Sequence, residues 1–218
     1  MMTKAIFPIL LAILALAQLL SCLCGKDAVR MPTKIFLMPF VALAYLSVAK
    51  EPSGWVVAGL MFGCLGDLAL LWPLKPVPFA LGTISFALGH ICYLIFLFST
   101  FSIAVKPVWI ALIALVYLAG CIVVYVKSRP NIPRAVRPVP FPYMLLLASV
   151  SVCTLLALIS NASLGCVMAF LGATSFLVSD GILSNMLFVK KAEPPKQNFA
   201  VMATYTAAQV LLTAGWAL

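Results

Sequence analysis

Long uninterrupted runs of apolar residues, separated by short stretches of charge, proline or glycine, form the pattern of this sequence. The hydrocarbon core of a bilayer is about 30 Å thick, so a helix needs about 20 residues to cross it. The runs have that length and lack the alternation of barrel strands, so we expect helices. Most of the prolines lie between the runs, where helices stop. The eight runs span residues 5–24, 33–49, 55–72, 79–99, 108–126, 141–158, 164–188 and 199–218.

This pattern predicts an all-α integral membrane protein, with eight transmembrane helices in one bundle and residues 1–218 in a single domain. Composition agrees, since 65% of the residues are hydrophobic and only 9% are charged. An average soluble domain has about 45–50% and about 25% respectively. The first run, followed by Ser21 and Cys22, leaves open a second interpretation as a lipoprotein-type signal peptide. Its removal would leave seven helices.

The charges favour one orientation of the chain. The net charge of +9 comes from basic residues in the gaps between runs, which argues against a nucleic-acid surface. Counted on alternate sides, three basic residues (Lys4, Lys50, Lys106) stand against eleven. The eleven are Lys26, Arg30, Lys34, Lys75, Lys127, Arg129, Arg134, Arg137, Lys190, Lys191 and Lys196. The positive-inside rule then predicts that both termini face away from the cytoplasm, in a bacterial cytoplasmic or a eukaryotic intracellular membrane.

Metal and disulfide chemistry find little support in the sequence. His90 is the single histidine, and all seven cysteines fall in apolar runs, with only Cys22 and Cys24 close together. A zinc site needs several such ligands at close spacings. We therefore expect no metal ion and no disulfide framework.

Two acidic residues, Asp67 and Asp180, lie inside apolar runs. An ionised carboxylate there costs about 2.5–3.5 kcal/mol, so each acid should face the bundle interior and have a partner. A functional site explains them, and so does a structural hydrogen bond or a buried Asp–Lys pair. His90 leaves the same choice, since it can be a core histidine with Tyr93 packed beside it.

The depths of the polar residues converge on one side of the membrane. With about 1.5 Å per residue from the basic end of each run, the depths are about 8 Å for Asp67, 12 Å for Asp180, 9 Å for Tyr205, 15 Å for Gln209 and 16 Å for His90. Lys34 and Tyr143 lie near the surface on that side. Scattered structural hydrogen bonds have no reason to share one side, so we expect a single polar pocket that opens toward the basic face.

The surroundings of the two acids are related and suggest a four-plus-four internal repeat. The matching pairs are Gly59 with Gly172, Gly66 with Ser179, Asp67 with Asp180, and Leu70 with Leu183. The small residues Gly59, Gly63 and Gly66, at helical spacing, predict the close approach of a neighbouring helix.

The motifs on successive helices resemble those of the YhhN-like lysoplasmalogenase family. They are Gly66-Asp67, Gly89-His90-x-x-Tyr93, Tyr143-Met144, Ser179-Asp180 and Tyr205-x-x-x-Gln209, and the resemblance spans nearly the whole chain. It implies an eight-helix membrane hydrolase that acts on the vinyl ether bond of lysoplasmalogens. The products would be a fatty aldehyde and glycerophosphocholine or glycerophosphoethanolamine.

Hydrolysis of a vinyl ether begins with protonation of the alkenyl carbon, which forms an oxocarbenium ion to which water adds. Two carboxyl groups suit this chemistry, one as the general acid and the other to stabilise the cation and activate water. We expect Asp67 and Asp180 in these roles, with Asp180, the deeper, as the acid, and no cofactor. His90, Tyr143, Tyr205 and Gln209 would orient the carboxyl groups and water, Tyr93 and Ser179 would support them, and Lys34 would meet the substrate phosphate.

The lysophospholipid substrate and water are thus the expected partners, with membrane lipids around the helices and no nucleic acid. The main alternative is a small proton-coupled membrane transporter, because intramembrane acids and an internal repeat are typical of that class too. A site placed on one side of the membrane, away from the midplane, favours the hydrolase.

Overall fold

The structure, a computed structural model, describes residues 2–73, 75–190 and 194–218. Within these residues the chain forms eight α-helices and no strand. The helices are α1 (Met2–Cys24), α2 (Asp27–Val48), α3 (Gly54–Ala69), α4 (Pro76–Thr100), α5 (Pro107–Ser128), α6 (Pro140–Ser160), α7 (Leu164–Ser184) and α8 (Pro195–Ala217). Two short 3-10 turns follow α5, and a π-helical turn, η3 (Asn185–Lys190), continues α7. Lys191, one of the eleven basic residues counted above, lies outside the described residues.

Six helices are long and apolar enough to cross a membrane, namely α1, α2, α4, α5, α6 and α7 with its η3 extension. Among the others, α3 is apolar but has only 16 residues. In α8, polar side chains such as Tyr205, Gln209 and Thr213 are buried against neighbouring helices. The outward faces carry many large apolar side chains, as helices that face lipid do. These features indicate a multi-pass membrane protein, and the count of eight spans stays a prediction.

Proline and serine mark where the helices begin. The prolines at the first position are Pro76 in α4, Pro107 in α5, Pro140 in α6 and Pro195 in α8. Proline suits this position because its missing N–H would have no partner inside the helix. The other type of start is a serine cap, since the Ser53 side chain accepts from Trp55 N in α3 and the Ser163 side chain accepts from Cys166 N in α7.

The helix bounds differ from the predicted runs by up to six residues, as three examples show. The helix predicted to start at residue 33 starts at Asp27 and passes through Pro32, which membrane helices tolerate. The helix predicted to end at residue 72 ends at Ala69, because Pro73 disfavours helical geometry in the residue before it. In the predicted run 164–188, the regular helix ends at Ser184 and the π-helical turn follows.

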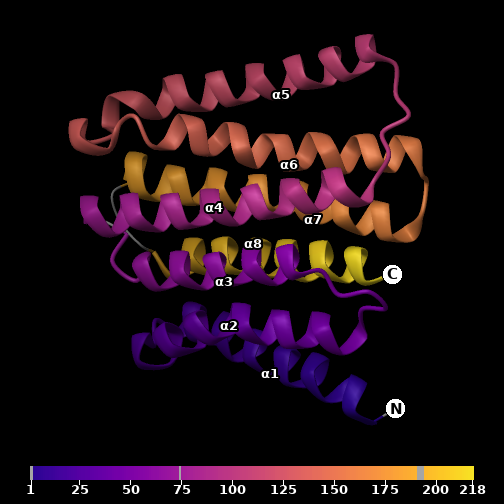
Figure 1. Cartoon of the computed structure of the whole chain (residues 1–218). Helices are drawn as coiled ribbons and strands as arrows, with labels where there is room; N and C mark the ends of the chain where they lie inside the picture. Colours follow the sequence, from indigo (N-terminus) through magenta and orange to yellow (C-terminus); the bar gives the residue numbers. More distant parts are fainter. Residues whose placement is uncertain (1, 74, 191–193) are drawn as a thin grey trace.

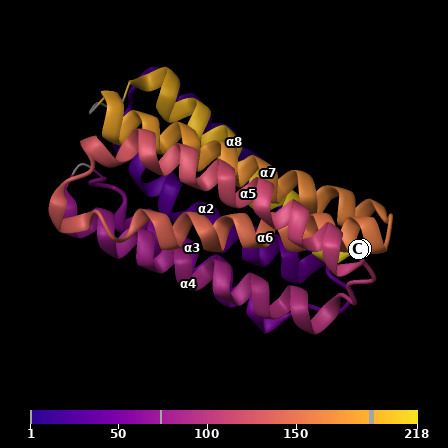
Figure 2. The same cartoon turned by 90° about the horizontal axis from the view of Figure 1, so that it is seen from above.

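The helices lie side by side in one bundle, with α5 at one edge and α1 and α2 at the other (Figure 1). Contacts between neighbours join α2, α3, α4, α6, α7 and α8 into a closed ring, with α1 packed on α2 and α8 and α5 packed on α6. Figure 2 shows the bundle from the side on which α5 and α6 lie, with both helices in front. The N-terminal start of α1 and the end of α8 lie at the same end of the bundle (Figure 1). Which side of a membrane that end faces stays a prediction.

Two helix pairs, α3–α4 and α7–α8, are packed almost backbone to backbone. A Cβ added to Gly89 would lie 2.9 Å from the carbonyl oxygen of Gly59, and one added to Gly172 would lie 2.8 Å from that of Ala208. A serine hydroxyl crosses each pair as well. Ser85 Oγ in α4 donates to Phe62 O in α3 at 2.6 Å, and Ser175 Oγ in α7 donates to Thr204 O in α8 at 2.8 Å.

Three of the four glycines of α3, namely Gly59, Gly63 and Gly66, each make room for an aromatic side chain of a neighbouring helix. A Cβ at Gly59 would lie 2.3 Å from the ring of Tyr93, and one at Gly66 would lie 2.7 Å from that of Phe86. Gly63 faces the Tyr205 hydroxyl, 3.5 Å from the Cβ position. Close packing of α3 therefore delivers aromatic residues of α4 and α8 to the bundle interior.

Substitution of Gly172 tests the close packing of α7 and α8. We expect Gly172→Ala to lower the free energy of unfolding by about 1–3 kcal/mol, because its Cβ would meet backbone atoms that cannot yield. Gly120→Ala is the matched control, since nothing lies within 4 Å of its Cβ position. Thermal unfolding in detergent measures both, and equal midpoints for the two variants would contradict the packing.

Candidate active site

A cavity of about 400 Å³ lies within the bundle, at the end that carries most of the basic residues. Its lining comes from the beginnings of α2, α4, α6 and α8, the ends of α3 and α7, the turn η3 and the middle of α5. The predicted site residues that line it are Asp67, Asp180, Lys34, Tyr143, Ser179 and Tyr205. The structure therefore brings six of the predicted site residues together around one space, at the basic end expected from their depths.

Asp67 is almost fully buried near the end of α3 and contacts two polar side chains. Lys34 Nζ lies 3.7 Å from its Oδ1, and the Tyr205 hydroxyl donates to its Oδ2 at 2.8 Å. Lys34 Nζ also donates to Leu70 O at 3.2 Å, at the C-terminus of α3 where a cation is favoured. The ammonium of Lys34 thus balances Asp67, and its contact with a substrate phosphate stays a prediction.

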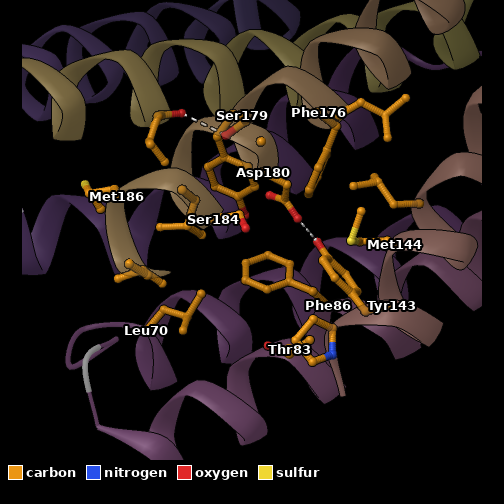
Figure 3. A pocket seen from close by; sticks show the side chains of 18 of the residues that line it. Leu70, Thr83, Phe86, Tyr143, Met144, Phe176, Ser179, Asp180, Ser184 and Met186 are labelled. Atoms are coloured by element: carbon orange, nitrogen blue, oxygen red, sulfur yellow. Dashed lines mark hydrogen bonds between the residues drawn. The ribbon is translucent and has the colours of Figure 1, made fainter. Parts of the chain in front are cut away.

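Asp180 lies near the end of α7 and is half-buried, since part of its surface faces the cavity. The Tyr143 hydroxyl of α6 donates to its Oδ2 (Figure 3). No ion pair to Asp180 occurs within the part of the chain that the structure describes. Both acids therefore receive a tyrosine hydroxyl, but among the described residues only Asp67 also has a salt-bridge partner. Ser179, beside Asp180, lines the cavity and donates from Oγ to Val201 O at 3.0 Å.

Aromatic rings close the inner end of the cavity. Phe86, Phe176 and Tyr205 pack edge to face, with ring centroids 5.4–6.3 Å apart, and all three line the cavity. Figure 3 shows Phe86 and Phe176 near the pair formed by Asp180 and Tyr143. Apart from the two acids and their partners, most of the cavity lining is apolar, with exceptions such as Thr83 and Ser184.

His90, Tyr93 and Gln209 lie beyond this aromatic layer and do not line the cavity. His90 is buried, its Nδ1 is 2.7 Å from Phe86 O, and its ring packs 4.7 Å from Phe176 and 5.8 Å from Tyr143. Tyr93 donates to Gln209 Oε1 at 2.8 Å and so joins α4 to α8. Neither His90 nor Gln209 has a hydrogen bond to Asp67 or Asp180, and their expected role in orienting the carboxyl groups stays a prediction.

The cavity also contains residues that the sequence analysis did not select. Arg30 precedes Lys34 by one helical turn, so its place on the same face could have been read from the spacing. Phe86 and Phe176 carried no such signal, because an aromatic residue in an apolar helix looks the same in a core and at a site. Among the described residues, no group of three or more His, Cys, Asp or Glu side chains is placed to hold a metal ion.

The chain belongs to the YhhN family, whose model matches residues 29–216. This family is known for hydrolase activity, and membership is consistent with a lysoplasmalogenase. Comparison with curated proteins and with solved structures finds no match. The matched range includes every residue discussed above as part of the cavity.

The pair of Lys34 and Asp67 is testable by a double-mutant cycle. We expect Lys34→Met to lower the free energy of unfolding by about 3 kcal/mol, because it leaves a buried acid without its cation. Adding Asp67→Asn should recover much of that loss. Thermal unfolding in detergent gives the coupling, and Lys75→Met, at an exposed lysine of the same end, is the control. Strictly additive losses would contradict the pairing.

Proposed function

We propose that the protein is a lysoplasmalogenase that hydrolyses the vinyl ether bond of lysoplasmalogens at Asp67 and Asp180. The observation that carries this proposal is the pair of acids on one apolar cavity with unequal partners, one facing a cation and the other only a hydroxyl. The reaction needs a proton donor and an anion in one water-poor space, and such a pair supplies both.

The chemistry starts with transfer of a proton to the alkenyl carbon that is not bound to oxygen. The double bond then becomes an oxocarbenium ion, whose positive charge needs a nearby carboxylate. Water adds to the oxygen-bound carbon and loses a proton, which gives a hemiacetal. Collapse of the hemiacetal releases the aldehyde and leaves the glycerol hydroxyl on the phospholipid head. Each turnover consumes one water, and the acid regains its proton.

Asp180 is the proton donor in this proposal. The Tyr143 hydroxyl occupies its Oδ2, which leaves Oδ1 to hold a proton and deliver it into the cavity. Asp67 is the anion, because Lys34 and Tyr205 both favour its charged form and hold it against the cavity wall. From that wall it stabilises the oxocarbenium ion and accepts a proton from the attacking water.

The two acids have corresponding places in a four-plus-four repeat, which is also a proposal. The alignment that pairs Asp67 with Asp180 sets residues 113 positions apart against each other. It places the helix pair α3–α4 on the pair α7–α8, and both pairs are closely packed. Lys34 and Tyr143, the partners of the two acids, lie on the corresponding helices α2 and α6 but one helical turn out of register, since Tyr143 aligns with Arg30. One half thus offers a cation and the other a neutral hydroxyl.

The cavity suits a lipid with a polar head. Arg30 lines it near the basic end of the bundle, so the phosphate of a lysophospholipid can lie there while the chain extends among apolar side chains. In this proposal Arg30 contacts the head-group phosphate, which is the role that the sequence analysis expected of Lys34. If the basic end faces the cytoplasm, as the positive-inside rule predicts, the substrate enters from the cytoplasmic leaflet.

Aldehyde release from purified protein tests the function and its acids together. We expect the wild type to release fatty aldehyde from a choline or an ethanolamine lysoplasmalogen. Asp67→Asn and Asp180→Asn should each lower the rate by about 10²–10⁴-fold, the contribution of a positioned acid or base. Glu51→Gln, at an exposed acid, is the matched control and should leave the rate unchanged. Full activity in either Asp variant, with the protein folded, would contradict the two-acid mechanism.

A further inference from the structure

The cavity extends beyond the two acids into a cleft between α5 and α7. On the α5 side, Val116, Gly120 and Val124 line it, and on the α7 side Leu177 and Gly181 do. Helix α5 packs on α6 and on η3, and α6 packs on α7, so α6 lies beneath the cleft. Met144 and Leu147 of α6 form that floor. One cleft therefore joins the acids to the outer edge of the bundle.

The two helices that form the cleft leave space between them, whereas other helix pairs of this bundle are in close contact. Nothing lies within 4 Å of a Cβ built on Gly120 or on Gly181, whereas a Cβ on Gly172 would meet the backbone of α8 at 2.7 Å. Val116 is 70% exposed and Val124 is 40% exposed although both line the cavity. The two glycines thus leave a space at the height of Asp180, next to Gly181.

The outer edge of the cleft meets the lipid. The side of α5 away from the bundle carries exposed large apolar residues such as Leu112, Leu115 and Ile122, as expected of a helix against hydrocarbon. Val116 and Val124 are eight residues apart, so the cleft follows α5 for about 12 Å along the membrane normal. An apolar molecule in the bilayer can therefore reach the cleft sideways, without crossing the head-group layer.

We propose that this cleft is the chain-binding groove and lateral entrance for a single hydrocarbon chain, namely the alkenyl chain of the lysophospholipid substrate. The inference rests on the proposed function, which sets the vinyl ether at Asp67 and Asp180. Three features select the occupant. The lining between α5 and α7 is apolar, it is continuous with the two acids, and the whole cavity of about 400 Å³ is near the lower end of ligand pockets, about 300–1,000 Å³.

The groove should make the protein prefer long-chain substrates, because a short chain does not reach it. A long alkenyl chain fills the cleft from Gly181 to Val116, and each buried methylene adds binding energy. A propenyl chain ends near the acids and needs no groove. Filling the groove should therefore separate the two substrates.

The experiment compares two groove variants with two neighbours that face away from the cavity. Gly120→Leu and Val116→Phe fill the groove on α5, and Ala119→Leu and Leu115→Phe add the same side chains at exposed positions that do not line it. Rates of aldehyde release are measured for a long-chain lysoplasmalogen and for the propenyl ether of glycerophosphocholine.

We expect each groove variant to lower kcat/KM for the long-chain substrate by about tenfold or more. The propenyl substrate should change by no more than about twofold, and the neighbour variants should change neither substrate beyond that range. Equal losses for both substrates in the groove variants, or no loss for the long chain, would overturn the groove.

A second measurement tests chain binding in the groove independently of the proposed hydrolase activity. A lysophosphatidylcholine with a diazirine at the chain end is photolysed with wild-type protein in bilayers, and labelled peptides are mapped. Labelling of Met144 and Leu147 that is lost in Gly120→Leu but kept in Ala119→Leu supports the groove, even if wild-type protein releases no aldehyde and the proposed function fails. Labelling that is the same in both variants, or absent from α6, overturns it.

Discussion

Burial of two acidic side chains inside an apolar helical bundle is the constraint on which the rest of the structure depends. Each charged acid would cost about 2.5–3.5 kcal/mol without a partner, so helices distant in sequence must bring polar groups to it. Lys34 and Tyr205 come to Asp67 from α2 and α8, and Tyr143 comes to Asp180 from α6. The glycines of α3 allow this, because they let α4 and α8 approach with their aromatic residues. The same packing that satisfies the acids therefore also builds the apolar cavity between them.

Unequal partners turn two similar acids into two different groups. A carboxylate beside an ammonium keeps its charge, and a carboxyl whose partner is a hydroxyl can keep its proton. Vinyl ether hydrolysis needs both forms at once, on either side of a short-lived cation. In the proposed repeat, the cation comes from Lys34 on α2 and the hydroxyl from Tyr143 on the corresponding helix α6, one helical turn out of register. In the proposed function, Arg30 at the basic end would select the head group, and the cleft between α5 and α7 would select the chain.

Sequence reasoning reached the helical fold and the basic-end cavity because these depend on length, composition and depth along each helix. It reached the family through the resemblance of its motifs. Depth separates Asp67, Asp180 and Tyr205 from the deeper His90 and Gln209, and only the first three line the cavity. The aromatic layer that makes this division, Phe86 with Phe176, has no signature in an apolar sequence. The pairing of Lys34 with Asp67 could not be predicted either, because depth along a helix does not give the direction in which a side chain points around the helix axis. For the same reason the π-helical turn after Ser184 and the open cleft beside Gly120 could not be predicted.

The central claim is that a buried carboxyl group protonates the alkenyl carbon and water supplies the aldehyde oxygen. The measurement that tests it most directly is hydrolysis of a lysoplasmalogen in deuterium oxide by the purified protein, with the aldehyde reduced at once to the alcohol and analysed by mass spectrometry. The account predicts one solvent deuterium on the carbon next to the former carbonyl, in every product molecule. Aldehyde without that deuterium, or no aldehyde from either head group, would contradict it.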